Sequence, residues 1–141
     1  MSGTATVDPD LPDVLNAHVR ARFARLERAG ALPPGEVGEY RVGEAGSEQV
    51  GTRVRFELRT DQGKVLAARF RAYGCPWTLA VCDWVAEQLK QRGLPEPPPG
   101  GPEGWAAVLG VPLERLGRLL VIEDALLAAL RPAEIPEMAR L

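Results

Sequence analysis

The pattern of apolar and polar positions predicts a helix near the start of the chain. From Pro12 to Arg28, apolar residues recur at spacings of three and four, as on one face of an α-helix. Asp10 or Asp13 can cap the start of this helix, and Gly30 is expected to end it.

The middle of the chain alternates between apolar and polar residues, which is typical of strands with one buried face. One strand is predicted over Val50 to Thr60 and a second over Lys64 to Tyr73. The intervening Asp61-Gln62-Gly63 favours a hairpin, since Gly63 can take the positive φ that such turns need. A shorter candidate, Val37 to Val42, is predicted to be an edge strand.

The alternation assigns a different chemistry to each face of the predicted sheet. One face is expected to be apolar and to carry Val54, Phe56, Leu58, Leu66, Ala68, Phe70 and Ala72. The other is expected to be largely cationic and to carry Arg53, Arg55, Glu57, Arg59, Val65, Ala67, Arg69, Arg71 and Tyr73. This pattern indicates an antiparallel sheet that helices cover on one side only.

The rest of the chain is predicted to be helical. Helices are expected over Pro76 to Arg92, with Gly93 ending the helix, over Glu103 to Leu109 and over Leu113 to Leu130. Residues 93–102 are rich in proline and glycine and are predicted to form a loop. The whole chain, residues 1–141, is therefore expected to be one α+β domain, with a three-stranded antiparallel meander and helices packed on one face.

Composition narrows the classes of function. The chain has 141 residues, with 17 Lys and Arg against 19 Asp and Glu, so its formal net charge is −2. This balance gives no large positive field for nucleic acid. No apolar run reaches the length of a membrane span, and residues 1–10 lack the pattern of a signal peptide. We therefore expect a cytoplasmic protein without nucleic-acid or membrane partners, and the two cysteines are too few for a disulfide framework.

Cys75 is the main candidate for chemistry. Gly74 permits a tight turn after the second long strand, and Pro76 suits the first position of a helix. Cys75 is then expected at the N-cap, facing the free N–H groups of Trp77 and Thr78. The helix dipole and these donors would stabilise a thiolate, which is typical of a reactive cysteine. A small buried apolar role for this residue is the alternative.

Other candidates favour structural roles. Cys82 falls on the apolar stripe of its helix and is expected in the core, too far along the helix from Cys75 for a disulfide. His18, the single histidine, is expected at the edge of the core. Glu123 and Asp124 are expected to be a solvated polar pair. The spacing of the cysteines and the histidine predicts no complete metal site.

The segment from Val65 to Leu89 resembles part of the IscU/NifU-type iron–sulfur cluster scaffold family. In that family a strand ends in an aromatic residue, glycine and cysteine, as in Tyr73-Gly74-Cys75, and the cysteine begins a helix and is a cluster ligand. Glu123-Asp124-Ala125 is similar to a motif in the last helix of these scaffolds. The resemblance implies their fold, which we describe as IscU/NifU N-terminal-like and SufE-like.

The same resemblance implies a depleted ligand set. Such scaffolds use three cysteines and an assisting aspartate. In this chain the first cysteine position falls at Val50, the aspartate position at Thr52 and the third cysteine position at Arg118. Cys75 alone remains, so the chain is identified as a divergent member that lacks two of the three ligand cysteines. A 2Fe–2S cluster needs about four protein ligands.

Three functions follow as expectations. The first is an iron–sulfur cluster assembly protein in which Cys75 is the remaining ligand for iron or a cluster, or accepts persulfide sulfur. Any cluster would then need ligands from a second chain or from glutathione. The second is a sulfur-transfer accessory to a cysteine desulfurase. The third is a degenerate, non-catalytic paralogue that serves as an interaction module. A scaffold or sulfur acceptor is expected rather than an enzyme, with a cysteine desulfurase or other assembly proteins as partners.

Overall fold

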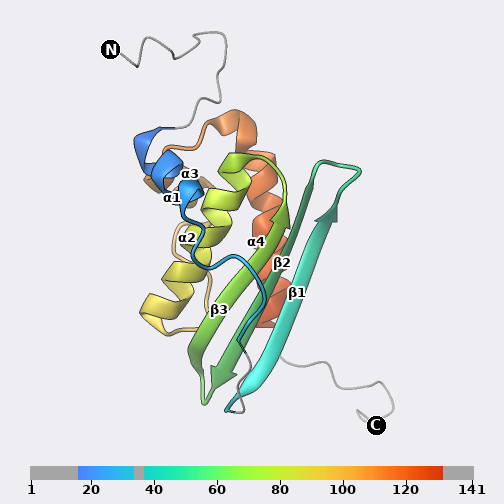
Figure 1. The fold of residues 1–141 in the computed structure, drawn as a ribbon, viewed down its shortest axis with the longest axis vertical. Coiled ribbons are helices and arrows are strands. Elements are labelled where there is room, and N and C mark those ends of the chain that lie inside the picture. The colour runs from blue at the N-terminus through green and yellow to red at the C-terminus, as the bar shows by residue number, and fades with distance from the viewer. Residues whose placement is uncertain (1–15, 34–36, 132–141) are drawn as a thin grey trace.

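A computed structural model describes residues 16–33 and 37–131 as a sheet with helices on one face (Figure 1). The strands are β1 (Glu39–Ser47), β2 (Thr52–Asp61) and β3 (Lys64–Tyr73). The helices are α1 (Ala17–Ala24), α2 (Pro76–Arg92), α3 (Gly101–Leu109), the 3-10 turn η1 (Leu113–Arg115) and α4 (Leu116–Leu130). The sheet has the order β1-β2-β3 with both pairs antiparallel, which confirms the predicted α+β meander.

The turn between β2 and β3 has the predicted hairpin chemistry. Asp61 pairs with Lys64, and the two residues between them take positive φ, 50° at Gln62 and 77° at Gly63. Two successive positive φ angles give the turn the twist of the flanking strands. Both neighbouring strands therefore pair along nearly their whole length.

The edge strand β1 is longer than the sequence predicts. The expected strand covered Val37 to Val42, whereas β1 runs from Glu39 to Ser47 and pairs with Thr52 to Thr60 of β2. Its second half contains glycines, which have low strand propensity, so pairing with β2 decides the conformation there. A Cβ at Gly43 would overlap the backbone of α4 at Ala125 and Ala129. Gly43 thus lets the backbones of β1 and α4 approach each other closely.

A bulge changes the predicted faces of β3. The register shifts between Arg59 and Thr60 of β2, so that Thr60 lies opposite Val65 while Arg59 lies opposite Ala67. Leu66 is the extra residue, and its side chain is 37% exposed, whereas Val65 is 4% exposed. The assignment of Leu66 to the apolar face and Val65 to the cationic face was therefore wrong. Beyond the bulge, Ala68 and Phe70 are buried as predicted.

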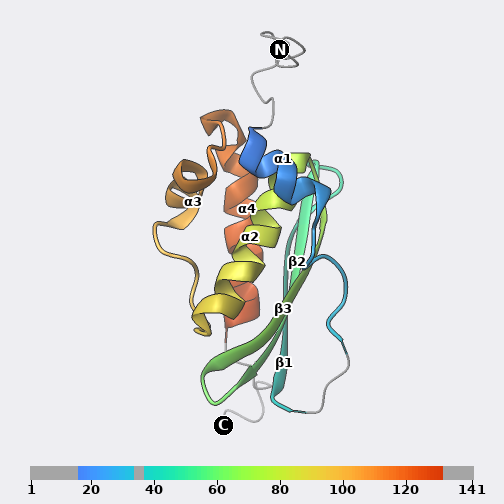
Figure 2. The same cartoon turned by 60° about the vertical axis from the view of Figure 1, so that its left-hand side comes forward.

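The core lies between the sheet and helices α2 and α4 (Figures 1 and 2). Its fully buried side chains include Val54, Phe56, Leu58, Val85, Leu119, Ile122 and Leu126. Helix α2 has the predicted bounds, with Pro76 in its first turn and Gly93 in the left-handed conformation at its end. None of the helices in the described ranges has the length and apolar character that a membrane crossing requires.

The first helix is shorter than predicted. Asn16 caps α1, because its side chain accepts a hydrogen bond from the Val19 N–H at 2.8 Å, and the helix ends at Ala24 rather than at Arg28. The predicted caps Asp10 and Asp13 lie outside the described residues.

After the end of α1, the chain is held by contacts with residues that are distant in the sequence. The backbone N–H of Arg28 donates to Asp83 on α2 at 2.9 Å, and Ala29 forms a parallel bridge with Phe70 of β3. Arg22 and Asp83 also form an ion pair at 2.7 Å, in which the Asp83 side chain is buried. These contacts fix α1 and the segment after it against α2 and β3.

The proline-rich stretch is shorter than predicted at its end, because α3 begins at Gly101 within the expected loop of residues 93–102. The loop packs against the helix that follows it. The Trp105 Nε1–H donates to the Pro98 carbonyl at 3.0 Å, and both residues are buried. The last helix is likewise preceded by a 3-10 turn over Leu113–Arg115, so its α-helical part begins at Leu116 rather than Leu113.

Candidate functional site

Cys75 is the N-cap of helix α2, as the sequence predicts. Its backbone is extended, with φ −79° and ψ 168°, and Pro76 follows in the first turn. The predicted contact with the N–H groups of Trp77 and Thr78 is wrong, because the thiol makes no side-chain capping hydrogen bond. Its Sγ lies instead 3.5 Å from the Thr78 Oγ1. Cys75 is partly buried and packs against the edge of the core, so part of the residue remains exposed at the start of the helix.

Thr78 is a site residue that the sequence analysis missed. Its side chain is fully buried, and its hydroxyl faces the Cys75 thiol at the third position of the helix. A Cβ at Gly74 would lie 3.1 to 3.2 Å from the Thr78 side chain, so the glycine leaves the room that Thr78 occupies. A hydroxyl three residues after an N-cap residue is the sequence signal that could have found it.

Cys82 is a core residue, as predicted. Its side chain is fully buried on α2, and burial, with a further contribution from the Asp83 carboxylate, raises the pKa of its thiol well above the ordinary value. Both cysteines are free. The two cysteines therefore differ in burial, and Cys75 is the one that keeps some exposed surface.

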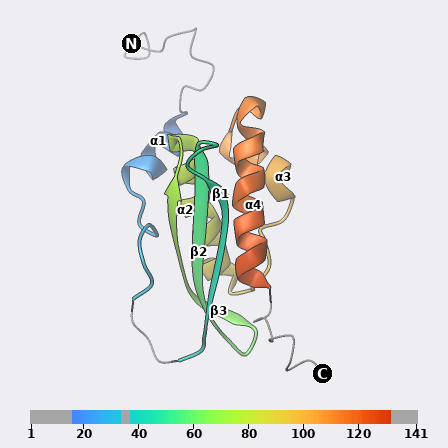
Figure 3. The same cartoon turned by 90° about the vertical axis from the view of Figure 1, so that its right-hand side faces the viewer.

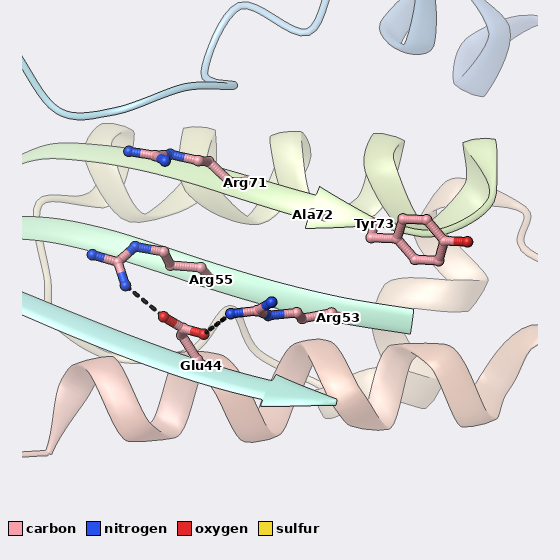
Figure 4. A pocket seen from close by; sticks show the side chains of 6 residues that line it. All are labelled: Glu44, Arg53, Arg55, Arg71, Ala72 and Tyr73. Carbon is pink, nitrogen blue, oxygen red and sulfur yellow. Dashed lines mark hydrogen bonds and ion pairs between the residues drawn. The ribbon is translucent and has the colours of Figure 1, made fainter. Parts of the chain in front are cut away.

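A row of charged side chains lies on the outer face of the sheet, opposite the helices (Figure 4). Glu44 of β1 pairs with Arg53 at 3.0 Å and with Arg55 of β2. Glu57 pairs with Arg55 at 2.9 Å and with Arg71 of β3 at 3.5 Å. Hydrogen bonds from Arg53 and Arg55 lower the pKa of Glu44.

Glu57 departs from the prediction that it faces solvent. Its side chain is only 4% exposed, because residues 29–33 cross the outer face above it and the Leu32 N–H donates to its Oε1 at 3.0 Å. Burial acts to raise the pKa of Glu57, but this hydrogen bond and the arginines outweigh burial and hold its pKa below the ordinary value. Glu57 is therefore held as a buried carboxylate under the crossing segment.

Beyond the crossing segment, toward Tyr73, the outer face is open and hollowed. The hollow has a volume of about 260 Å³ and is lined by Glu44, Arg53, Arg55, Arg71, Ala72 and Tyr73. Tyr73 ends β3 two residues before Cys75. The two arginines of β3 bond other groups than the thiol: Arg71 pairs with Glu57, and Arg69 donates to the Ala68 carbonyl.

Comparison with known families decides the relationship of the chain. Residues 18–130 match the family model of the NifU-like N-terminal domain. The chain belongs to this family. None of the curated proteins matches the sequence of this NifU-like chain. The match covers both long strands and helices α2 to α4, and so includes Cys75.

The structural comparison agrees on the fold. The NifU-like chain is similar to the crystal structure of a candidate iron–sulfur cluster assembly scaffold protein for the SUF system (FiSufU) from Fervidobacterium islandicum AW-1. The TM-score is 0.58 at 17% identity, and the similarity covers 92% of this chain and 100% of that one. At this identity the comparison shows a shared fold.

The positions that the resemblance assigned to further ligands hold no metal-binding side chains. Val50 precedes β2 and is 70% exposed, and Thr52 is buried at the start of β2. Arg118 lies in the first turn of α4, and its Nε is buried without a hydrogen-bond partner. The start of α4, the β1–β2 turn and the start of α2 lie at the same end of the molecule (Figures 1 and 3).

The residues at this end of the NifU-like domain do not fit a complete cluster site. Within the residues that the structure describes, no three His, Cys, Asp or Glu side chains come together to hold a metal ion. A valine offers no donor atom, and a guanidinium repels a cation. Glu123 is partly buried and Asp124 exposed on α4. His18 lies in α1, but its side chain is outside the described residues.

Proposed function

We propose that this protein acts in iron–sulfur cluster assembly and that Cys75 is its working thiol. The observation that carries this proposal is the contrast between the two cysteines of a NifU-like domain. Cys75 is partly exposed at a helix start, whereas Cys82 is fully buried. A thiolate at the start of a helix is stabilised by the dipole of that helix.

Accepting sulfur suits this site better than holding a whole cluster. One thiolate supplies one ligand, whereas a 2Fe–2S cluster takes about four. Sulfur transfer needs only one nucleophile. The Cys75 thiolate attacks the outer sulfur of a persulfide on a cysteine desulfurase, the S–S bond of the donor breaks, and a new S–S bond forms on Cys75. The donor cysteine leaves as a thiolate, so the exchange needs no external oxidant or reductant.

The role in this scheme is that of an acceptor and carrier of sulfur, with the cysteine desulfurase as the enzyme. Thr78 would assist by holding the thiol in place at the turn, since its hydroxyl lies 3.5 Å from the Cys75 Sγ. A cluster or iron ion bound through Cys75 would need its remaining ligands from a second chain or from glutathione. This second possibility makes a different experimental prediction.

A desulfurase assay tests the proposal. Alanine production from cysteine is measured with wild type, Cys75→Ser and, as the matched control, Cys82→Ala, and the protein is then examined by mass spectrometry for the added sulfur. We expect wild type and Cys82→Ala to increase the rate and gain sulfur, and Cys75→Ser to do neither. Equal behaviour of wild type and Cys75→Ser would contradict the proposal and favour the inert interaction module.

Anaerobic reconstitution with iron and sulfide, with and without glutathione, tests the cluster alternative. Visible absorption that depends on Cys75 and on glutathione would favour a shared cluster. Sulfur transfer without such absorption would favour the carrier role.

A further inference from the structure

The outer face of the sheet is more positive than the protein as a whole. The arginines and glutamates on this face are Glu44, Arg53, Arg55, Glu57, Arg59, Arg69 and Arg71, and the opposed Asp61 and Lys64 at its far end cancel each other in charge. Five arginines against two glutamates leave three positive charges in excess, although the formal net charge of the chain is −2. Charge separation of this kind steers association with oppositely charged surfaces.

Part of this face is covered by the chain itself. Residues 29–33 cross it near Glu57, where the Leu32 N–H bonds the carboxylate and Arg59 donates to the Pro33 carbonyl at 3.3 Å. The open part is therefore the end toward Cys75. There the side chains of Arg53 and Arg71 are 52% and 58% exposed and form two walls of the hollow.

The arginines of the hollow already bind a carboxylate of the protein itself. Glu44 lies between Arg53 and Arg55, where its carboxylate receives hydrogen bonds from both guanidinium groups (Figure 4). Arg71 forms a long ion pair of 3.5 Å with Glu57. Each guanidinium has five donors, so Arg53 and Arg71 keep donors for a further carboxylate.

The sign pattern favours an acidic protein segment over a nucleic acid. A strand of nucleic acid presents a continuous row of phosphates, which Glu44 and Glu57 on the same face would repel. A protein loop can place single carboxylates beside the arginines and leave neutral or basic residues beside the glutamates. The hollow also measures only about 260 Å³, which suits one or two side chains.

We propose that the open outer face, formed by Arg53, Arg55, Arg71 and Tyr73, docks an acidic loop of the protein that delivers sulfur to Cys75. This inference rests on the proposed function for the identity of the partner. Tyr73 lines the hollow and lies two residues from Cys75, so their Cα atoms are within about 7 Å of each other. A loop seated in the hollow therefore brings its own protein up to the thiol.

A binding assay with an acidic peptide tests the surface without relying on the thiol. A short fluorescein-labelled peptide, in which single glutamates are separated by neutral residues, is titrated by anisotropy into Cys75→Ser protein, alone or with Arg53→Glu and Arg71→Glu added. Both arginines are more than half exposed, so their replacement should leave the fold intact. Arg25→Glu, at the exposed end of α1, is the matched control. We expect the double change to weaken binding about tenfold or more, and the control to have no effect.

Two comparisons decide the nature of the ligand. Binding that falls with rising salt and is lost with a Gln-rich peptide supports a carboxylate site. Equal affinity of the double variant and the control would overturn the inference, as would tighter binding of a single-stranded oligonucleotide than of the acidic peptide.

A kinetic assay connects the surface with sulfur transfer. In the desulfurase assay we expect the double variant, with Cys75 present, to need about ten times more protein for half-maximal stimulation. Its maximal rate and the alkylation rate of Cys75 should stay unchanged. If Cys75 receives no sulfur, the proposed function fails, while the peptide assay still tests whether the outer face binds carboxylates. If transfer needs Cys75 but ignores both arginines, the docking inference alone fails.

Discussion

The unequal burial of the two thiols predicts a large difference in their reaction rates. Native protein is treated at neutral pH with an excess of a chromogenic thiol reagent, and wild type is compared with Cys75→Ser and Cys82→Ala. Cys75 is partly exposed and should react directly, whereas Cys82 has no exposed surface and should react only after the protein opens.

The size of the difference follows from the stability of a domain. Folded domains are stable by about 5–15 kcal/mol, and each 1.4 kcal/mol is a factor of ten. Even the lower limit keeps the open form below about one molecule in a thousand. The raised pKa of Cys82 also leaves less of the nucleophilic thiolate when the thiol is buried. We therefore expect one fast thiol and a second that reacts at least about a thousand times more slowly.

The variants identify which thiol is fast. Cys75→Ser should keep only the slow phase and Cys82→Ala only the fast phase, and both thiols should react at once in denaturant. A fast phase that survives in Cys75→Ser would refute the reasoning from burial. A native protein with two slow thiols would refute it too, because Cys75 would then be closed to reagents.

Three further predictions concern the parts of the fold that support the site. Gly43→Ala should lower the free energy of unfolding by about 3 kcal/mol in chemical denaturation, because the new methyl group meets the backbone of α4. As the control, Gly117→Ala should be neutral or stabilise the protein by up to about 1 kcal/mol, because its methyl group meets no other atom. Equal effects of the two changes would contradict the close approach of β1 and α4. Thr78→Val should change the alkylation rate of Cys75 at neutral pH while Thr78→Ser restores it, because the hydroxyl lies 3.5 Å from Sγ; an unchanged rate in the valine variant would show that the hydroxyl has no influence. Folding lowers the pKa of Glu57, so its carboxylate stabilises the protein above about pH 4.5 and loses this effect as the pH falls through the lower native pKa. The loss of stability in Glu57→Gln should therefore become smaller in acid. A loss that stays constant from pH 7 to pH 3 would contradict this prediction.

Local signals in the sequence account for the parts of the fold that were predicted well. Helix α2 has its predicted bounds because proline and glycine mark its two ends, at Pro76 and Gly93. The hairpin before β3 was predictable for the same reason, since Gly63 takes the positive φ that the turn needs. Cys75 could be placed at the N-cap because its neighbours on both sides carry such signals.

Contacts between distant parts of the chain account for the errors. The first helix was predicted to continue to Arg28, but the backbone there bonds Asp83, which lies 55 residues away. The bulge that buries Val65 depends on register with β2, and Glu57 is covered by a segment 25 residues earlier. Periodicity describes one element at a time, so none of these was visible in it. The polar contact of Cys75 differed because Thr78 offers its hydroxyl in place of the backbone.

The segment that crosses the outer face gives the molecule a way to open in part. The Gly30 N–H and the Arg28 carbonyl bond Phe70 on either side of Ala29. Helix α1 is held by the ion pairs of Arg22 with Asp83 and Glu87 and by Val19, which is fully buried in the core. We expect these contacts to break together while the sheet, α2 and α4 stay packed, because they all lie in residues 16–33. Such opening would also expose Val19 and break the hydrogen bond from the Asn16 side chain to the Leu109 carbonyl. Amide hydrogen exchange at Gly30 should then report the smaller free energy of this opening rather than that of global unfolding. Release of residues 16–33 would uncover the Glu57 carboxylate and the edge of β3, and would so enlarge the charged surface beside Cys75.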